Sequence, residues 1–396
     1  MPVSAPSLAR RGAAFGLLAA AASGPGQTFF IGLFGASFRA DFGLSSAALG
    51  VLYGAATLGA GLLMFWLGAL ADRLAPGRAM ALALAVLGAG ALLVAGADTA
   101  LPLVAGLFLL RLGGQGLAGH FAIVVAARFG GAARGRTIAV AAMGFMLAEA
   151  TFPLLVTAAL GSFGWRAVWV AVPIALIALA LPALLHIGRP FPAPTLPGAQ
   201  QADDVSAVWT RRRLLRAPQF VGALGTVLVP AFVVTALFFH QTALAEQFGW
   251  TPSAVARAFI VYAGCQAAAI FIAGQLVDRF SARALVPVYL LPLAGGVLAT
   301  VVAPPAAALW LLFAGLGVTA GANSVLAGAL WVELFGSRSI GLVRGMYAGC
   351  MVLSSAVSPA LLGALLSADV AAPLIFIPVA AYAALMPLLL RPLLRG

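Results

Sequence analysis

Long apolar segments separated by short polar breaks dominate the chain. Charged residues and Gly/Pro pairs divide it into twelve such segments, most of them near the ~20 residues that a helix needs to cross a bilayer. Numbered one to twelve in chain order, they lie at roughly 12–37, 46–71, 79–97, 101–127, 137–161, 165–187, 218–243, 252–277, 284–302, 306–332, 343–367 and 371–391. The pattern predicts an all-α integral membrane protein with twelve transmembrane helices.

A single long polar stretch, 188–217, separates the first six spans from the second six. It opens with Pro190 and ends in the basic run from Arg211 to Arg216. This composition is typical of a cytoplasmic linker that lies on an anionic membrane surface. We therefore predict an N-terminal half at 1–187, a linker at 188–217 and a C-terminal half at 218–396.

The two halves repeat each other at a constant spacing of 206 residues. Phe42-Gly43 recurs as Phe248-Gly249, and Asp72-Arg73 recurs as Asp278-Arg279. Bias toward Ala, Leu and Gly would not match Asp-Arg pairs in loops. The repeat predicts two parallel, pseudo-symmetric six-helix halves with a substrate site between them near the membrane midplane.

Composition and charge exclude a soluble protein and favour one membrane orientation. Hydrophobic residues make up 63% of the chain and charged residues 8%, against about 25% charged residues in a soluble domain. The net charge of +12 comes from arginine alone, because the chain has no lysine. Arg39, Arg166 and Arg257 fall on one side, Arg111 falls within the membrane, and every other arginine falls on the opposite side. The positive-inside rule places both termini in the cytoplasm, so no nucleic-acid partner is expected.

Other sequence features exclude several further classes. Cys265 and Cys350 lie inside apolar spans, so we expect neither a disulfide framework nor a metal site. Arg10-Arg11 resembles the start of a signal peptide, but the apolar run continues to Gly35, which is too long for a signal sequence. There is no P-loop, so we expect no cofactor and transport driven by a gradient. The lack of lysine indicates a GC-rich genome, hence a bacterium and its inner membrane.

Two loop motifs and one span motif carry a family resemblance. The segments 68–73 (Gly-Ala-Leu-Ala-Asp-Arg) and 274–279 (Gly-Gln-Leu-Val-Asp-Arg) resemble motif A, Gly-x-x-x-Asp-Arg, of the major facilitator superfamily. The segment 111–116 (Arg-Leu-Gly-Gly-Gln-Gly) is similar to that family's span-four motif with an intramembrane arginine. The segments 26–30 and 111–120 look most like prokaryotic relatives of the monocarboxylate and oxalate carriers. The resemblance covers essentially the whole chain and implies transport by alternating access.

The same resemblance implies a role for the motif A residues. Asp72, Arg73, Asp278 and Arg279 stand at cytoplasmic ends of spans and are expected to gate that side through charge contacts and helix dipoles. Glu333 precedes a loop with Arg338 and Arg344, and we expect it to pair with one of them.

Arg111 and Glu149 lie near the middle of apolar spans, where burying a charged side chain costs free energy. Arg111 lies about ten residues into span four, or ~15 Å deep at ~1.5 Å per residue, which is the middle of a ~30 Å hydrocarbon layer. Glu149 reaches a similar depth in span five. One interpretation is a structural ion pair between the two spans. The other is that Arg111 binds a substrate anion while Glu149 takes up or releases the coupling proton.

Several uncharged polar residues also lie at membrane depth. Gln115 shares the helix face of Arg111 and could bind substrate or another helix. His120 could relay protons, although a histidine at such a position is more often simply packed and hydrogen-bonded. The remaining candidates for substrate contact, each of which could instead join helices, are Gln27, Tyr262, Gln266 and Asn323.

These residues together predict a monomeric secondary transporter that moves a small organic anion, such as a carboxylate, with a proton. Efflux of amphipathic drugs by proton antiport is the alternative, although the segment 144–153 lacks the Gly-Pro pair typical of drug antiporters. An integral-membrane enzyme would show clustered carboxylates, His pairs or a Ser/His arrangement at one membrane face, and none is visible. A transport-dead sensor would carry a soluble output domain, and the linker is too short for one.

Overall fold

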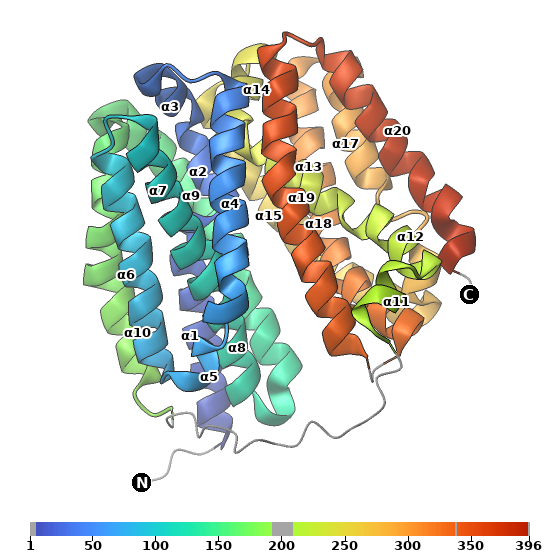
Figure 1. Cartoon of the computed structure of the whole chain (residues 1–396), viewed down its shortest axis with the longest axis horizontal. Coiled ribbons are helices and arrows are strands. Elements are labelled where there is room, and N and C mark those ends of the chain that lie inside the picture. Colours follow the sequence, from blue (N-terminus) through green and yellow to red (C-terminus); the bar gives the residue numbers. More distant parts are fainter. Residues whose placement is uncertain (1–4, 192–208, 337–338, 395–396) are drawn as a thin grey trace. The chain divides into compact units, whose positions relative to one another are not determined.

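The chain forms two compact helical units. The computed structural model describes residues 5–191, 209–336 and 339–394, and these ranges contain helices, turns and connections but no strand. The units comprise residues 1–198 and 199–396, so their boundary falls inside the predicted linker (Figure 1). Most of that linker, 192–208, lies outside the described residues.

The helices of the first unit follow the first six predicted spans. They are α1 (Ala5–Ala22), η1 (Gly24–Gly26), α2 (Thr28–Ile31), η2 (Gly32–Phe34), α3 (Gly35–Phe42), α4 (Ser46–Leu67), α5 (Leu70–Arg73), α6 (Pro76–Ala95), α7 (Ala100–Leu110), η3 (Arg111–Ala118), α8 (Gly119–Phe129), η4 (Gly131–Ala133), α9 (Arg134–Ala175), η5 (Leu176–Ala180) and α10 (Leu181–Gly188). Inside α9, Gly164 has φ 74°, which separates spans five and six. Glycine adopts this left-handed conformation without a steric penalty.

The helices of the second unit follow the last six predicted spans. They are α11 (Arg211–Leu215), α12 (Pro218–Val227), α13 (Val229–Phe239), α14 (Gln241–Phe248), α15 (Pro252–Phe280), α16 (Ala282–Leu285), α17 (Leu291–Val302), α18 (Pro305–Phe335), α19 (Ile340–Ser367), α20 (Ala372–Leu390) and η6 (Arg391–Leu394). Helix α11 forms within the predicted linker, and its Leu214 is completely buried.

Within the described residues, 9 helices are long and apolar enough to cross a membrane. Three local features explain why this number is below twelve. Span one is broken by the turn at Gly24–Gly26, span nine is regular only over Leu291–Val302, and spans five and six run on as one segment, Gly131–Gly188. With these features taken into account, the predicted all-α fold of twelve spans in two six-helix halves is confirmed.

The internal repeat extends to the capping of equivalent helices. Gly43 ends α3 with φ 61°, and Gly249 ends α14 with φ 68°. Two residues later, the Ser45 hydroxyl accepts a hydrogen bond from the backbone N–H of Ala48 at 3.1 Å. Thr251, the equivalent residue, caps α15 in the same way at 3.2 Å. Each unit therefore uses the same left-handed stop and hydroxyl N-cap at this corner.

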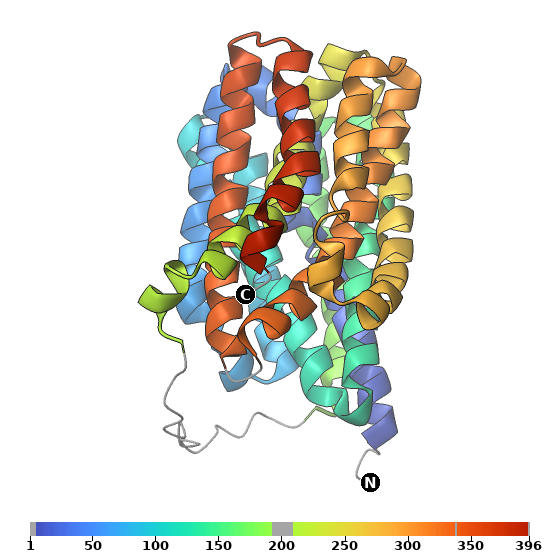
Figure 2. The same cartoon turned by 90° about the vertical axis from the view of Figure 1, so that its right-hand side faces the viewer.

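Packing inside each unit brings together helices that are distant in sequence. In the first unit, α1 packs against α8, α9 and α10, while α4 packs against α7 and η3 (Figure 1). In the second unit, α15 and α17 pack against α18, and α17 also packs against α20. Figure 2 shows these helices of the second unit in yellow to red. In the first unit, η1 packs against η3, so the break in span one lies beside span four.

Candidate functional site

The break in span one is the centre of the candidate site. Helix α1 ends at Ala22, and the chain passes through Ser23-Gly24-Pro25-Gly26 before helix resumes at Thr28. Pro25 has no N–H to donate, and the turn leaves the carbonyl group of Gly26 outside a regular helical ladder. Irregular backbone at membrane depth is tolerated only where it is buried in protein or lines a cavity.

Two glycines let this break touch the backbone of span four. A Cβ added at Gly26 would lie 2.2 Å from the carbonyl oxygen of Leu110, and one added at Gly114 would lie 2.6 Å from the Cα of Gly26. Span four is itself irregular at this point, because residues Arg111–Ala118 form a π-helix. Short π-helical stretches occur frequently at functional sites. The broken part of span one thus packs directly on the π-helical part of span four.

Arg111 projects into this junction and binds only neutral groups. Its side chain is 3% exposed. Its Nε donates to Thr57 Oγ1 at 3.2 Å, and its Nη1 donates to the Gly26 carbonyl oxygen at 3.0 Å. Nη1 also lies 3.4 Å from Thr28 Oγ1, whose hydroxyl bonds Tyr53 at 2.7 Å. Nη2 has no hydrogen-bond partner within the part of the chain that the structure describes. The site therefore holds a buried cation whose charge no carboxylate neutralises there.

The ring of Tyr53 completes the surroundings of the guanidinium. The Cζ atom of Arg111 lies 5.3 Å from the centre of that ring, within the range of a cation–π contact. Sequence reasoning missed Tyr53, Thr57 and Thr28. A signal existed for Thr57, because it is a hydroxyl residue near the middle of span two, at a depth similar to that of Arg111.

Glu149 lies on the other side of the same break. Its neighbours on α9, Ala148 and Phe152, pack against Gly24: a Cβ on that glycine would lie 2.5 Å from the Phe152 ring. Glu149 shares a helix face with Phe145, which is next to Gly119 of span four. Among the described residues, no hydrogen-bond partner reaches its buried Oε2 atom.

Arg111 and Glu149 do not form an ion pair in this structure. The salt bridges found among the described residues, with N···O at or below 4.0 Å, include neither side chain. The interpretation of the two residues as a standing structural pair is therefore not supported. Both instead come from spans that pack on the break in span one, and neither has a charged partner among the described residues.

The other polar candidates of the first unit divide between two places. Gln27 follows the break directly, and its Nε2 donates to Ser23 Oγ at 3.2 Å. Gln115 lies in the same π-helix as Arg111 and is exposed. His120 lies farther along span four, where its Nε2 is near Gly68 at the end of span two. The structure thus groups Gln27 and Gln115 with the junction, and it groups His120 with the loop of motif A.

The candidates of the second unit lie on two closely packed helices. A Cβ added at Gly317 of α18 would lie 2.3 Å from the carbonyl oxygen of Tyr262 on α15, and one at Gly321 would lie equally close to that of Gln266. Tyr262 is buried among aromatic rings, 4.9 Å from that of Phe238. The side-chain oxygens of Gln266 and Asn323 are buried and have no hydrogen-bond partner among the described residues. These two amides are therefore groups with unused acceptor capacity.

The first motif A region forms an ion pair that the sequence did not reveal. Asp72 is paired with Arg128 at the end of span four, and Arg128 also donates to the Ala71 carbonyl oxygen at 2.9 Å. Arg73, the neighbour of Asp72 in the motif, is exposed. The contact thus joins the loop after span two to span four.

The equivalent region of the second unit uses reversed charges. Glu333, at the end of span ten, accepts from the backbone N–H groups of Ala282 and Arg283 at 2.7 and 3.0 Å. The Arg283 side chain in turn donates to the Glu333 carbonyl oxygen. Glu333 was predicted to pair with Arg338 or Arg344; among the described residues its partners are instead Ala282 and Arg283, in the loop after span eight. Of the two predicted partners, Arg338 lies outside the described residues.

The second motif A pair itself takes no part in that contact. Asp278 and Arg279 are both exposed, and the guanidinium of Arg279 lies 5.0 Å from the centre of the Phe280 ring. Within the described ranges no ion pair includes either residue.

A further charged cluster fastens the opposite end of the first unit. The Asp41 Oδ2 accepts from Trp165 Nε1 at 2.9 Å and from Arg166, whose Nη2 donates to the Ala97 carbonyl oxygen at 3.1 Å. The hydrogen bonds from Arg166 and Trp165 lower the pKa of Asp41 below its usual 3.8. Asp41 therefore joins the ends of spans one, three and six through ionised contacts.

This architecture defines a helical membrane transporter of two six-helix halves. The chain belongs to the Major Facilitator Superfamily, whose family model matches residues 16–244 and 224–395. No curated protein matches the sequence. The prediction of the superfamily is thus confirmed, and secondary transport of a small molecule follows as the general class of function.

Solved structures of transporters share the fold. The nucleoside transporter NupG matches with TM-score 0.75 and 13% identity over 98% of this chain and 99% of that one. A D-xylose-proton symporter matches with TM-score 0.68 and 14% identity over 97% and 96%. A bacterial homologue of the human lysosomal transporter Spinster, inward-facing and unoccupied, matches with TM-score 0.65 and 14% identity over 99% and 95%. At these identities the likeness establishes the fold alone.

Proposed function

We propose that this protein carries a small organic anion, a mono- or dicarboxylate, together with a proton by alternating access of its two halves. The observation that carries the proposal is the state of Arg111, which is buried with neutral partners and has one terminal nitrogen, Nη2, unused. An uncompensated cation is costly at membrane depth, and a substrate anion bound to it would offset that cost.

Arg111 is suited to bind a carboxylate because of how it is held. Hydrogen bonds from Nε to Thr57 and from Nη1 to Gly26 fix the guanidinium plane. A substrate carboxylate would meet a preoriented donor at Nη2 and would neutralise the buried charge. Charge-assisted hydrogen bonds of this kind are stronger than neutral ones. We propose Gln27 and Gln115 as further substrate contacts from the first unit.

Glu149 supplies a proton-binding group for coupling in this proposal. A buried carboxyl with no cation or donor at Oε2 is more easily accommodated with its proton than without it. Arrival of a substrate anion near the break in span one changes the local charge and so changes the proton affinity of Glu149. His120 is proposed as a relay at the end of span four. The proton would move with the substrate, which makes the protein a symporter.

The second half contributes neutral contacts in this mechanism. Gln266 and Asn323 present unused amide oxygens, which suit the hydroxyl or protonated groups of a substrate, and Tyr262 is proposed beside them. At the ends of the spans, Asp72 and Arg73 and their counterparts Asp278 and Arg279 are proposed as gating groups. We further propose that both termini lie in the cytoplasm, because nearly all arginines outside the spans fall on that side. We also propose that the protein is a monomer in the bacterial inner membrane.

Efflux of amphipathic drugs is the second candidate, and one groove favours it. An apolar groove of about 560 Å³ opens on the surface of the first unit between spans one, five and six. It is lined by Pro25 at the break, by Phe30 and by Phe152. The third candidate is transport of a neutral polar solute, which the names of the nucleoside transporter and the D-xylose symporter state for those two proteins. The uptake experiment described next distinguishes the three candidates.

Uptake by proteoliposomes tests the proposal. Radiolabelled small carboxylates, a nucleoside, D-xylose and a lipophilic cation are offered with and without an inward proton gradient. We expect gradient-driven uptake of a carboxylate by the wild type and its loss in Arg111→Gln. Arg257→Gln, which removes an exposed arginine outside the site, serves as control and should transport normally. Uptake only of the neutral or cationic probes, or unchanged carboxylate uptake in Arg111→Gln, would contradict the proposal.

A further inference from the structure

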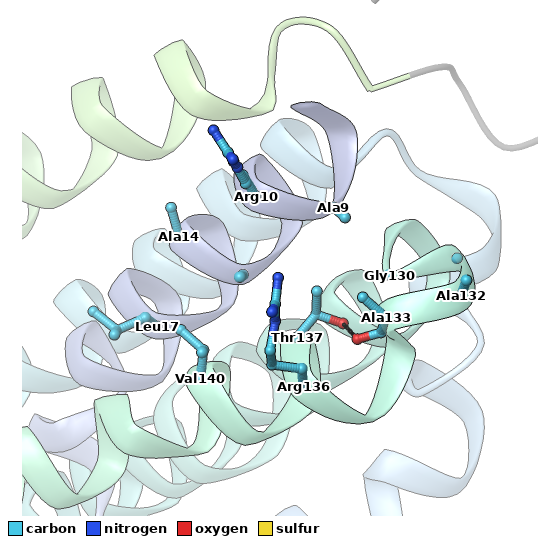
Figure 3. A pocket seen from close by; sticks show the side chains of 12 residues that line it. Ala9, Arg10, Ala14, Leu17, Gly130, Ala132, Ala133, Arg136, Thr137 and Val140 are labelled. Carbon is cyan, nitrogen blue, oxygen red and sulfur yellow. Dashed lines mark hydrogen bonds between the residues drawn. The ribbon is translucent and has the colours of Figure 1, made fainter. Parts of the chain in front are cut away.

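An arginine-lined cavity lies away from Arg111, at the end of the first unit that carries the N-terminus. Its volume is about 720 Å³. The walls come from α1, from the turn at 130–133 and from the first two turns of α9, which contribute Arg10, Arg136, Leu17 and Val140 among others (Figure 3). The cavity lies entirely within one unit, and the transport mechanism proposed above does not use it.

The two arginines of this cavity lack a protein partner. Arg10 and Arg136 are both exposed, and neither forms a hydrogen bond or an ion pair with a residue that the structure describes. None of the described residues that line the cavity is acidic. In Figure 3, Arg136 extends from α9 toward α1, and Arg10 extends from α1 in the same direction, so the two side chains do not point at each other. Both are exposed side chains at the same cavity, and an anion bound there would gain a charge-assisted contact from each.

The rest of the lining becomes apolar toward the membrane. Ala14 and Leu17 follow Arg10 on one face of α1, and Val140 follows Arg136 one turn further along α9. Figure 3 shows Leu17 and Val140 beyond the arginines, on the side away from the turn at 130–133. Arg10 and Arg136 stand just outside the apolar segments that begin at 12 and 137, which is the depth of lipid headgroups.

We propose that this cavity binds an anionic phospholipid, with its phosphate in contact with Arg10 and Arg136 and the start of an acyl chain along Leu17 and Val140. The shared chemistry is a phosphate group, which a soluble phosphate would also supply. A soluble phosphate would use only the arginine end, whereas a phospholipid matches both the charged and the apolar part. The bound lipid would hold the start of span five against span one at the membrane surface.

Lipid binding to the purified full-length protein in a neutral detergent tests the proposal. Phosphatidylglycerol, phosphatidylcholine and inorganic phosphate are titrated separately, and binding is followed by native mass spectrometry and by the shift in unfolding temperature. The test variant is Arg10→Gln/Arg136→Gln. The control is Arg11→Gln/Arg134→Gln, which removes the same charge from neighbouring positions that do not line the cavity. Unfolding temperatures without lipid show whether each variant is folded, and the single variants Arg10→Gln and Arg136→Gln replace the double one if it is not.

We expect phosphatidylglycerol to bind the wild type and the control alike, and to bind the test variant at least about tenfold more weakly. Phosphatidylcholine should bind the wild type more weakly than phosphatidylglycerol does. Equal binding by wild type and test variant, or an equal loss in the control, would overturn the proposal. Arginine-dependent binding of inorganic phosphate without binding of phosphatidylglycerol would overturn the lipid assignment. Because the readout is binding of lipid, the outcome does not depend on the transport proposal.

Discussion

The Nη1 atom of Arg111 donates a hydrogen bond to the carbonyl oxygen of Gly26, 3.0 Å away, and so ties the charge of span four to the break in span one. Both partners depart from regular helix: Gly26 belongs to a 3₁₀ turn and Arg111 begins a π-helix. The two irregularities therefore depend on each other. A movement of span one would therefore move the guanidinium of Arg111. We propose that this link couples substrate binding to helix movement.

Gly26→Ala should damage both stability and transport. The new Cβ would stand 2.2 Å from the Leu110 carbonyl oxygen, so the backbones of spans one and four must separate. Overpacking of this kind costs about 1–3 kcal/mol or more, and the separation would lengthen the hydrogen bond from Arg111. The unfolding temperature and the uptake rate measure the two effects. Gly264→Ala is the matched control, because a Cβ there meets nothing within 4 Å, and it should behave as the wild type does.

Thr57→Val should weaken substrate binding while the protein stays folded. Valine keeps the shape of threonine but removes the oxygen that accepts from Arg111 Nε. A buried donor left without a partner costs about 1–3 kcal/mol, and the guanidinium loses one of its two orienting contacts. Binding affinity for the transported carboxylate measures the effect. Thr57→Ser keeps the acceptor and should retain most of the affinity; equal losses in the two variants would show that the methyl group, not the hydrogen bond, matters.

Glu149→Gln should separate coupling from substrate movement. The amide cannot exchange a proton but resembles the neutral carboxyl in shape and charge. We expect gradient-driven accumulation to stop while exchange of labelled for unlabelled substrate continues close to the wild-type rate. Glu246→Gln, at an exposed position, should leave both activities intact. If Glu149→Gln still accumulates substrate with the proton gradient, Glu149 is not the coupling group.

Much of this fold follows from the sequence because the bilayer restricts the options. Apolar length locates the spans, and the matched Asp-Arg pairs at 72–73 and 278–279 reveal the repeat. The prediction that Arg111 is functional remains a prediction; the structure shows that it is buried and that no carboxylate of the described residues pairs with it. Arg111 could be singled out from the sequence because a charged side chain at membrane depth costs free energy and is rarely kept without a function.

Other features had no local signal in the sequence. The acceptor Thr57 is 54 residues from Arg111, and the ion pair of Arg128 with Asp72 spans 56 residues. Only packing brings such groups together. The reversed arrangement at Glu333 was missed because its partner Arg283 is 50 residues away in sequence. The π-helix at Arg111–Ala118 likewise includes Gly114, whose close contact with span one is made between segments distant in sequence.

Asp41→Asn should lower stability in a pH-dependent manner. Arg166 and Trp165 hold the pKa of Asp41 below 3.8 in the folded protein, so the folded state binds the proton less tightly than the unfolded state does. Its contribution is therefore fully present above that usual value and is lost as the pH falls through the lowered pKa. Unfolding temperatures should differ between wild type and Asp41→Asn at pH 7, and the difference should shrink below about pH 4.

The control for this prediction is Asp98→Asn, which changes an exposed acid outside the ion pairs of the described residues. It should unfold at the wild-type temperature at pH 7. A pH-independent difference for Asp41→Asn would mean that the carboxylate charge is not what joins these spans.

In the proposed mechanism, Arg111 binds the negative charge of the substrate. The most direct measurement compares the affinity of the purified protein for a transported carboxylate with its affinity for the neutral amide of the same compound. The wild type should prefer the carboxylate by about 1.5–3 kcal/mol, or roughly ten- to a hundredfold, and Arg111→Gln should lose that preference. A preference that persists unchanged in a folded Arg111→Gln, or a wild type that binds both compounds equally, would contradict the account.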